Sequence, residues 1–135
     1  EFWDMLDRLK ARGITIVVST PYMDEASRCD RIALIQKGKI LELDTLDKIL
    51  GRHSQNLYAV DADNRYQLMK DLRMPTEIES SFAFGEEQHV ALRTQENGVL
   101  YLTNYLTERG HTSIKVRPIL PNIEDTFIKL MLENQ

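Results

Sequence analysis

Apolar residues in the first twelve positions recur at spacings of three and four, which places them on one face of a helix. They are Phe2, Met5, Leu6 and Leu9. Gly13 then provides a residue that tolerates the left-handed backbone at a helix end. The pattern predicts a helix over residues 1–12 that stops at this glycine.

The next stretch, residues 14–18, is a continuous run of apolar and β-branched residues. Such a run is typical of a central strand whose two faces are both buried. A helix that leads through one glycine into such a strand forms the second half of a βαβ crossover. Because the first strand of that crossover is missing and no helix cap precedes Phe2, we expect a fragment, cut at Glu1, of a larger structure.

A short polar helix is predicted directly after this strand. Thr20 can accept a hydrogen bond from the first turn, and Pro21 suits the first helical position because it has no N–H to satisfy. Asp24 and Glu25 fall in the first turn, where acidic groups interact favourably with the helix dipole.

Two apolar runs on either side of residues 37–38 predict a β-hairpin across a glycine-containing turn. A short helix is predicted over residues 44–51, capped by Asp44 or Thr45. Residues 52–56 are polar and lack periodicity, so they are the best linker candidate.

Beyond residue 56 the pattern changes to short alternating strands and amphipathic helices, in the order β-α-β-β-α-β followed by a last helix. The expected elements are strands at 57–62, 78–84, 90–92 and 114–116, and helices at 64–72, 99–106 and from 122 onward. This order is that of the split-βαβ, ferredoxin-like arrangement, an antiparallel sheet with helices on one face. It predicts a small α+β domain over residues 57–135.

Composition narrows the class of protein. The 135 residues include 42% hydrophobic and 28% charged side chains, and the formal net charge is -4 with a pI near 5.4. This balance argues against nucleic-acid binding, which leaves a basic surface. The single cysteine, Cys29, excludes an internal disulfide, and no apolar run reaches the roughly 18 residues that span a bilayer. We expect a cytosolic protein.

The order of helix, apolar strand, S-T-x-Y-M-D-E-A, C-D-R-I, apolar strand and K-G-K-I resembles the C-terminal part of an ABC-transporter ATPase subunit, over about residues 1–50. The matching pieces are Ser19-Thr20, Glu25-Ala26, Asp30-Arg31-Ile32 and Gly38-Lys39-Ile40. At the other end, Pro121-Asn122-Ile123-Glu124-Asp125-Thr126-Phe127 is similar to the closing helix of the small domain that follows many bacterial ABC export ATPases, notably those for multidrugs and antibiotics.

This resemblance implies an α/β fragment of a P-loop ATPase core over residues 1–51, followed by a linker and by the ferredoxin-like domain with its C-terminal helix. It implies ATP and Mg²⁺ as cofactors of the complete parent, which would couple their use to export through a membrane permease. The implied partners are the missing N-terminal ATPase half, a second ATPase subunit and the permease. The implied location is cytoplasmic, peripheral at the inner face of the cell membrane.

Two departures from the family pattern limit the activity expected of this chain. Pro21 stands where the family has its switch histidine, whose imidazole can contact the γ-phosphate and orient the attacking water. The sequence also lacks the G-x-x-x-x-G-K-[ST] phosphate cradle, the family signature and the acidic Mg²⁺-binding strand. We therefore expect no catalytic, cofactor-binding or metal residue here, and no ATP binding or hydrolysis by these residues alone.

The remaining candidates are interpreted as structural. The three histidines lie in contexts unlike the switch loop, and His89 is predicted to face solvent because it alternates with apolar neighbours. Glu86-Glu87 is interpreted as a turn and Glu124-Asp125 as a helix cap. Tyr101 and Tyr105 form a stripe that predicts a core edge or a partner-binding ridge.

Two other functions remain open from the sequence. One is a non-enzymatic regulatory or protein-interaction module that keeps the ABC-like strands as a scaffold; the other is a free-standing ligand-binding protein. The apolar run at residues 14–18 disfavours the second, because such a strand needs neighbours on both sides. If these neighbours are missing, the exposed run predicts self-association of the chain.

Overall fold

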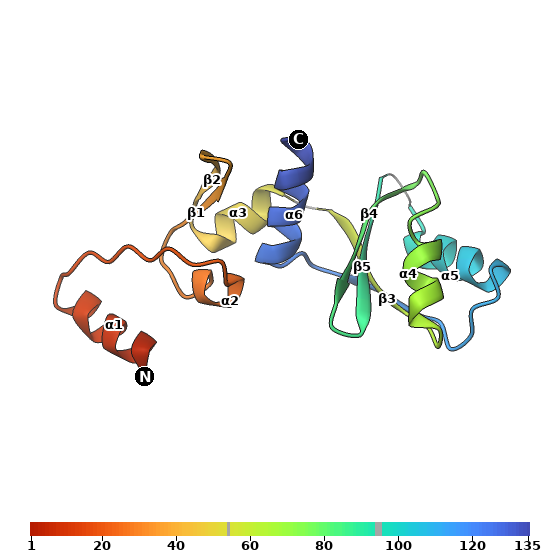
Figure 1. The fold of residues 1–135 in the computed structure, drawn as a ribbon, viewed down its shortest axis with the longest axis horizontal. Helices are drawn as coiled ribbons and strands as arrows, with labels where there is room; N and C mark the ends of the chain where they lie inside the picture. Colours follow the sequence, from red (N-terminus) through yellow and green to blue (C-terminus); the bar gives the residue numbers. More distant parts are fainter. Residues whose placement is uncertain (54, 94–95) are drawn as a thin grey trace.

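Helices and short antiparallel strands alternate along an elongated molecule (Figure 1). The computed structural model describes residues 1–53, 55–93 and 96–135. In these ranges it has six helices: α1 (Phe2–Ala11), α2 (Met23–Ala26), α3 (Leu46–Arg52), α4 (Arg65–Asp71), α5 (Gly98–Glu108) and α6 (Ile123–Glu133). The six strands of the same ranges are β1 (Ile32–Gln36), β2 (Lys39–Asp44), β3 (Asn56–Asp61), β4 (Ile78–Phe84), β5 (Glu87–Leu92) and β6 (Lys115–Ile119).

The strand predicted for residues 14–18 is not formed. Residues 14–20 have no regular secondary structure, and the side chain of Val17 is 92% exposed. A strand persists only where a neighbour satisfies its backbone N–H and C=O groups. Within the described residues no strand pairs with this segment. The prediction was wrong for this chain because β-branched composition favours a strand without supplying the partner strands.

The predicted first helix is present as α1, but it buries none of its side chains. Lys10 donates a hydrogen bond from Nζ to Asp30, with the two atoms 2.6 Å apart. The guanidinium of Arg28 lies 5.3 Å from the centre of the Trp3 ring and 3.6 Å from a carboxylate oxygen of Asp7. Solvent screens exposed contacts of this kind, so they contribute little and α1 is held weakly.

Strands β1 and β2 form the predicted hairpin as a separate two-stranded sheet. Gln36 pairs with Lys39, which leaves Lys37 and Gly38 as a two-residue loop with φ angles of 52° and 76°. Two positive φ angles are typical of the type I′ turn, whose twist matches that of the strands. Thr45 caps α3 through its hydroxyl, as predicted.

The second half of the chain contains a four-stranded antiparallel sheet with the strand order β4-β5-β3-β6. β3 lies in the middle, where Leu57 pairs with Ala91 of β5 and with Ile119 of β6. The predicted linker overlaps the end of α3 and the start of β3, and Ser54 within it lies outside the described residues.

Buried hydrophobic residues form two separate clusters. The first lies between the four-stranded sheet and helices α4 and α5; its members are Tyr58, Val60, Ala62, Leu68, Leu72, Ile78, Val90, Leu92, Leu102 and Leu106. The second lies between the hairpin, α3 and α6; its members are Ile32, Leu34, Ile49, Ile123 and Leu130. Helix α6 follows the four-stranded sheet in sequence, yet its apolar side packs with the hairpin and α3 (Figure 1).

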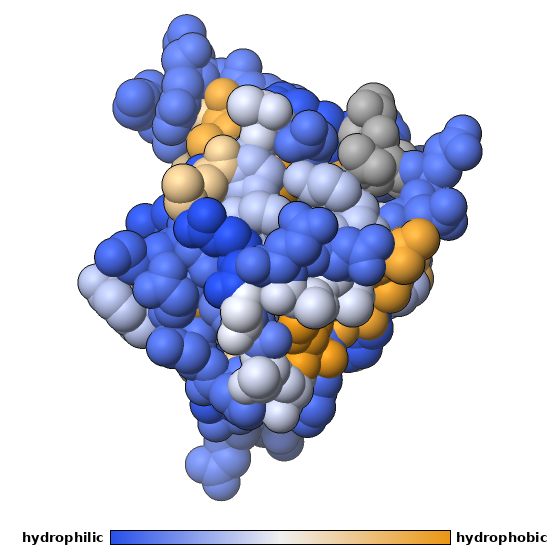
Figure 2. Space-filling view, turned by 90° about the vertical axis from the view of Figure 1, so that its right-hand side faces the viewer, coloured by the Kyte–Doolittle hydropathy of each residue, from blue (hydrophilic) through white to orange (hydrophobic). Residues whose placement is uncertain are grey.

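The end of the molecule that carries α4 and α5 is covered mainly by hydrophilic residues, with hydrophobic residues in limited patches (Figure 2). None of the helices in the described part of the chain has both the length and the apolar character needed to cross a bilayer.

Candidate functional site

Pro21, which the sequence places at the switch-histidine position of the family, lies in an exposed bend between residues 14–20 and α2. Thr20 does not cap α2 as predicted: its Oγ1 accepts a hydrogen bond from the N–H of Tyr22 at 3.1 Å, and Tyr22 itself occupies the N-cap position. Asp24 and Glu25 do lie in the first turn of α2. We call residues 20–24 the Pro21 segment. Proline has no side-chain donor or acceptor, so position 21 offers no acid, base or phosphate ligand.

A hollow of about 330 Å³ separates the Pro21 segment from the first turns of α6. It is lined by Pro21, Tyr22, Met23, Asp24, Glu124, Phe127 and Ile128. Phe127 and Met23 also pack against the second hydrophobic cluster, so both walls of the hollow are anchored in the same core. The Pro21 segment therefore lies near α6, although about 100 positions of sequence separate the two.

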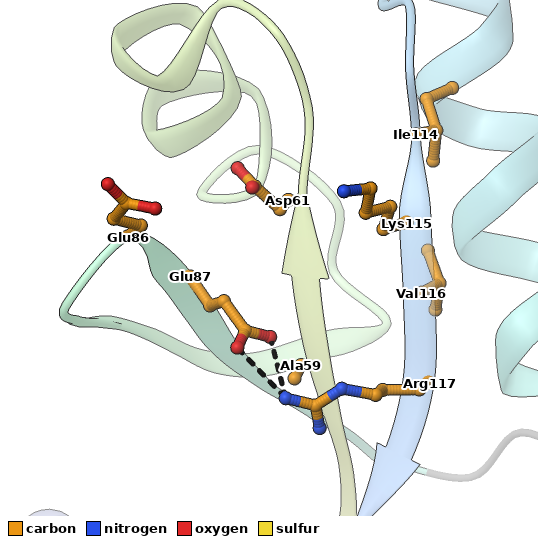
Figure 3. Close-up of a pocket in the computed structure, with 8 residues that line it drawn as sticks. All are labelled: Ala59, Asp61, Glu86, Glu87, Ile114, Lys115, Val116 and Arg117. Carbon is orange, nitrogen blue, oxygen red and sulfur yellow. Dashed lines mark hydrogen bonds and ion pairs between the residues drawn. The ribbon is translucent and has the colours of Figure 1, made fainter.

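A larger hollow of about 700 Å³ lies at one end of the four-stranded sheet (Figure 3). Its floor includes Ala59, and Arg117 reaches across this small residue to donate to both carboxylate oxygens of Glu87, at 2.9 and 3.0 Å. Asp61 lies at the upper side of the hollow, and hydrogen bonds from Arg65 lower the pKa of its carboxyl. Acidic and basic groups thus pair with one another around this hollow.

Each of the three histidines pairs with a carboxylate. The pairs are His53 Nε2 with Glu42 at 2.7 Å, His89 Nδ1 with Asp125 at 2.8 Å and His111 Nε2 with Asp71 at 2.7 Å. The prediction that His89 faces solvent was wrong: its side chain is only 16% exposed, and its ring stacks on Phe84 with centroids 4.2 Å apart. The alternation correctly separated His89 from the first cluster, but its imidazole is covered by Asp125 of α6 and by the Phe84 ring.

Asp71 holds the most buried polar network. Its carboxylate accepts hydrogen bonds from Arg109 at 2.8 Å, His111 at 2.7 Å and Gln67 at 2.9 Å. Burial alone would raise the pKa of this carboxyl, but the three donors outweigh burial and lower the pKa to about 2. The network ties the end of α4 to the residues after α5, and its role is structural. No sequence signal pointed to it, because Asp71 ends an ordinary helical pattern.

The two tyrosines of α5 lie at the edge of the first cluster, as one of the two interpretations predicted. The hydroxyl of Tyr105 donates to the backbone carbonyl of Asp71 at 2.6 Å, and that of Tyr101 lies 3.2 Å from a carboxylate oxygen of Glu77. Burial, together with the nearby Glu77 charge, raises the pKa of Tyr101 to about 12. Within the described residues no three His, Cys, Asp or Glu side chains are grouped to hold a metal ion.

A comparison of the sequence with models of known protein families found no match. Among curated proteins, the chain is 32% identical to the Nod factor export ATP-binding protein I of Bradyrhizobium diazoefficiens. The alignment extends over 133 residues and covers 95% of the chain. The chain is homologous to ABC-transporter ATP-binding proteins. The probable multidrug ABC transporter ATP-binding protein YbhF of Escherichia coli matches 49 residues at 41% identity, which is 36% of the chain and 8% of that protein.

The match to these ABC-transporter proteins is with their C-terminal part, and the chain spans about 40% of the length of the Nod factor export relative. The corresponding protein of Rhizobium etli is 28% identical over 136 residues, which is 95% of the chain and 39% of that relative. Because these alignments cover almost the whole chain, both hydrophobic clusters and the closing helix belong to the homologous region.

In this ABC-transporter homologue, the sequence did not predict which residues the side chains of α6 would contact. Asn122 and Asp125 were expected only as a cap, and they do form a reciprocal capping box. Asp125 is also 95% buried and bonded to His89, and Phe127 faces the Pro21 segment. Helical periodicity identified an apolar stripe on α6 but could not tell which of two cores it would enter.

Proposed function

We propose that the chain is the C-terminal part of the ATP-binding subunit of an ABC exporter, and that the complete subunit couples ATP binding and hydrolysis to export through a membrane permease. The observation that carries the proposal is the alignment of 95% of the chain with an export ATP-binding protein. The names of the relatives, which refer to Nod factor export and to multidrug transport, support export as the direction of transport.

The proposal assigns residues 1–51 to the ATPase core, 52–56 to a linker and 57–135 to an appended domain of ferredoxin-like arrangement. The strand order β4-β5-β3-β6 with every neighbour antiparallel supports this arrangement, as does the placement of α4 and α5 against one face. All members of the first hydrophobic cluster lie after residue 56, which supports a division close to that position, while Ile123 and Leu130 of α6 pack back into the second cluster.

Pro21 occupies the switch-histidine position in this proposal, so this chain contributes no catalytic side chain at that point. The exposed bend at Pro21 and the short helix that follows it support this assignment. An imidazole at this position would supply a hydrogen bond to the γ-phosphate, which proline cannot do. The complete subunit would therefore bind ATP, and its turnover would be weak or would depend on a partner subunit.

The partners that follow are the N-terminal ATPase half, a second ATPase subunit and a permease, with MgATP as the cofactor of the complete subunit and the cytoplasmic face of the membrane as its location. Residues 14–20 support the first of these partners, because no strand lies beside them in the described structure and their partly or fully exposed apolar side chains can pack against neighbouring strands.

The test is ATP turnover by the complete subunit with its permease, compared with the variant Pro21→His. We expect kcat to rise about tenfold or more with the added donor, while the affinity for MgATP stays within about twofold. Pro21→Ala is the matched control, because it removes the ring without adding a donor, and it is expected to leave kcat low. A complete subunit that neither binds nor hydrolyses ATP would contradict the proposal and favour a regulatory or interaction module.

A further inference from the structure

Helix α6 contacts both the second hydrophobic cluster and the four-stranded sheet. On one side, Ile123 and Leu130 are buried in the second hydrophobic cluster, and Phe127 and Met23 both pack against that cluster. On this same side Phe127 and Ile128 form the wall that faces the Pro21 segment. Figure 1 shows α6 between α3 and the four-stranded sheet.

On its other side, α6 is fixed to the four-stranded sheet. Asp125 Oδ1 is bonded to His89 Nδ1 of β5 at 2.8 Å, and Asp125 Oδ2 accepts from the N–H of Asn122 at 2.9 Å. One carboxylate therefore closes the capping box of α6 and joins the helix to the sheet. Phe84 stacks on the His89 ring, and Thr126 beside Asp125 is completely buried. The orientation of the first turn of α6 is thus determined by β5.

We propose that Phe127 is a positioning residue for the Pro21 segment, on which it acts through the second hydrophobic cluster, and that the His89–Asp125 hydrogen bond lets the four-stranded sheet control it. Three links in series carry this inference: the hydrogen bond between His89 and Asp125, one turn of α6, and the second hydrophobic cluster, against which Phe127 and Met23 both pack. A helix turn is rigid, and packed side chains transmit a displacement because the core contains little free volume.

The effect on catalysis rests on the proposed function, which places the Pro21 segment beside the γ-phosphate of ATP. There, a displacement of the small domain by any ligand or partner would move the segment through α6, which makes the domain a regulator of ATP turnover. The linkage itself is a property of residues 1–135 and can be measured without nucleotide.

The direct test is amide hydrogen exchange in residues 1–135 with the variant His89→Ala. The reporters are the amides of Ala26 and Ser27, which donate to the carbonyls of Tyr22 and Met23 in α2. We expect exchange at these amides and in the first turn of α6 to become about three- to tenfold faster, because one hydrogen bond that holds α6 is lost. The amide of Leu72 in α4 should keep its rate.

Two further variants make the result specific. Arg117→Ala removes an exposed ion pair at another place on the same sheet and should leave Ala26 and Ser27 unchanged. His89→Asn can restore a donor close to the Nδ1 position and should recover much of the protection. If His89→Ala does not fold, Phe127→Leu serves instead, with faster exchange expected at Ala26 and Ser27. Faster exchange in α6 without any change at Ala26 and Ser27 would overturn the linkage.

In the complete subunit with its permease, Phe127→Leu is expected to lower kcat for ATP several-fold while KM stays within about twofold, since a positioning residue acts on the transition state rather than on nucleotide affinity. An unchanged kcat would overturn the positioning role. Absence of ATP binding in the unmodified subunit would instead contradict the proposed function, and the exchange result would still stand.

Discussion

Asp71 shows how one buried side chain organises the small domain. Its carboxylate is 2% exposed and accepts hydrogen bonds from Arg109, His111 and Gln67. A buried carboxylate is tolerated only when donors replace its lost hydration, and here they do so with distances of 2.7–2.9 Å. His89 with Asp125 is the corresponding pair at the closing helix, and it carries the linkage proposed for α6.

The substitution Asp71→Asn is expected to destabilise the domain by about 2 kcal/mol at pH 7, because Arg109 loses the charge that compensates it and His111 loses a carboxylate partner. The folded-state pKa of Asp71 is about 2, below its ordinary value of 3.8, so its contribution is complete above about pH 4 and is lost as the pH falls through 2. Urea unfolding should show the difference between wild type and variant shrinking from pH 4 to pH 2.

The control for this experiment is Glu86→Gln, since the Glu86 side chain is 79% exposed and pairs only weakly with Arg65 at 3.3 Å. It should change the free energy of unfolding by less than about 0.5 kcal/mol. A difference between wild type and Asp71→Asn that stays constant from pH 7 to pH 2 would contradict the role assigned to this network.

At the level of elements, periodicity and turn chemistry predicted most of the fold. The hairpin was predicted because residues 37–38 allow a tight turn, and helix α6 because Asn122 is a good cap for an apolar stripe. The strand at residues 14–18 was predicted and is absent, because a strand depends on backbone partners that local sequence does not reveal. The contacts of α6 and Asp71 were missed for a related reason: they join residues far apart in sequence.

Alanine substitutions at Gly38 and Gly51 test the backbone conformation alone, because both glycines have open space around them. Gly38 has a φ angle of +76° in the hairpin loop, whereas Gly51 lies within α3, and a Cβ at either position would meet no atom within 4 Å. Gly38→Ala is expected to destabilise by about 1 kcal/mol through strain, and Gly51→Ala to stabilise by about 0.5–1 kcal/mol through helix propensity. Thermal unfolding measures both. Equal effects of the same sign would contradict the turn assignment.

For the molecule as a whole, residues 14–20 stand out because they expose apolar side chains and have no neighbouring strand in the described structure. Ile14 and Val17 are 48% and 92% exposed, and the backbone of residues 14–20 has no strand beside it in the described structure. Such a segment is a template for pairing with another chain. In the proposed exporter subunit the rest of the ATPase core would cover it, whereas residues 1–135 alone leave it open.

Residues 1–135 are therefore expected to self-associate in light scattering, with an apparent mass that grows with concentration. The double variant Ile14→Glu/Val17→Glu should shift the sample towards monomer, because charge at this segment opposes pairing. Leu120→Glu is the matched control, since Leu120 is 91% exposed before α6 and lies outside the segment. A monodisperse monomer of the unmodified chain across the concentration range would contradict this expectation.

We propose that these residues belong to an ATP-binding subunit while lacking the elements that bind ATP. Calorimetric titration of MgATP into residues 1–135 and into the complete subunit, side by side, tests both halves of this proposal. We expect micromolar affinity for the complete subunit and no detectable binding by residues 1–135 up to about 1 mM, which is about 4 kcal/mol weaker than micromolar binding. Micromolar binding of MgATP by residues 1–135, or none by the complete subunit, would contradict it.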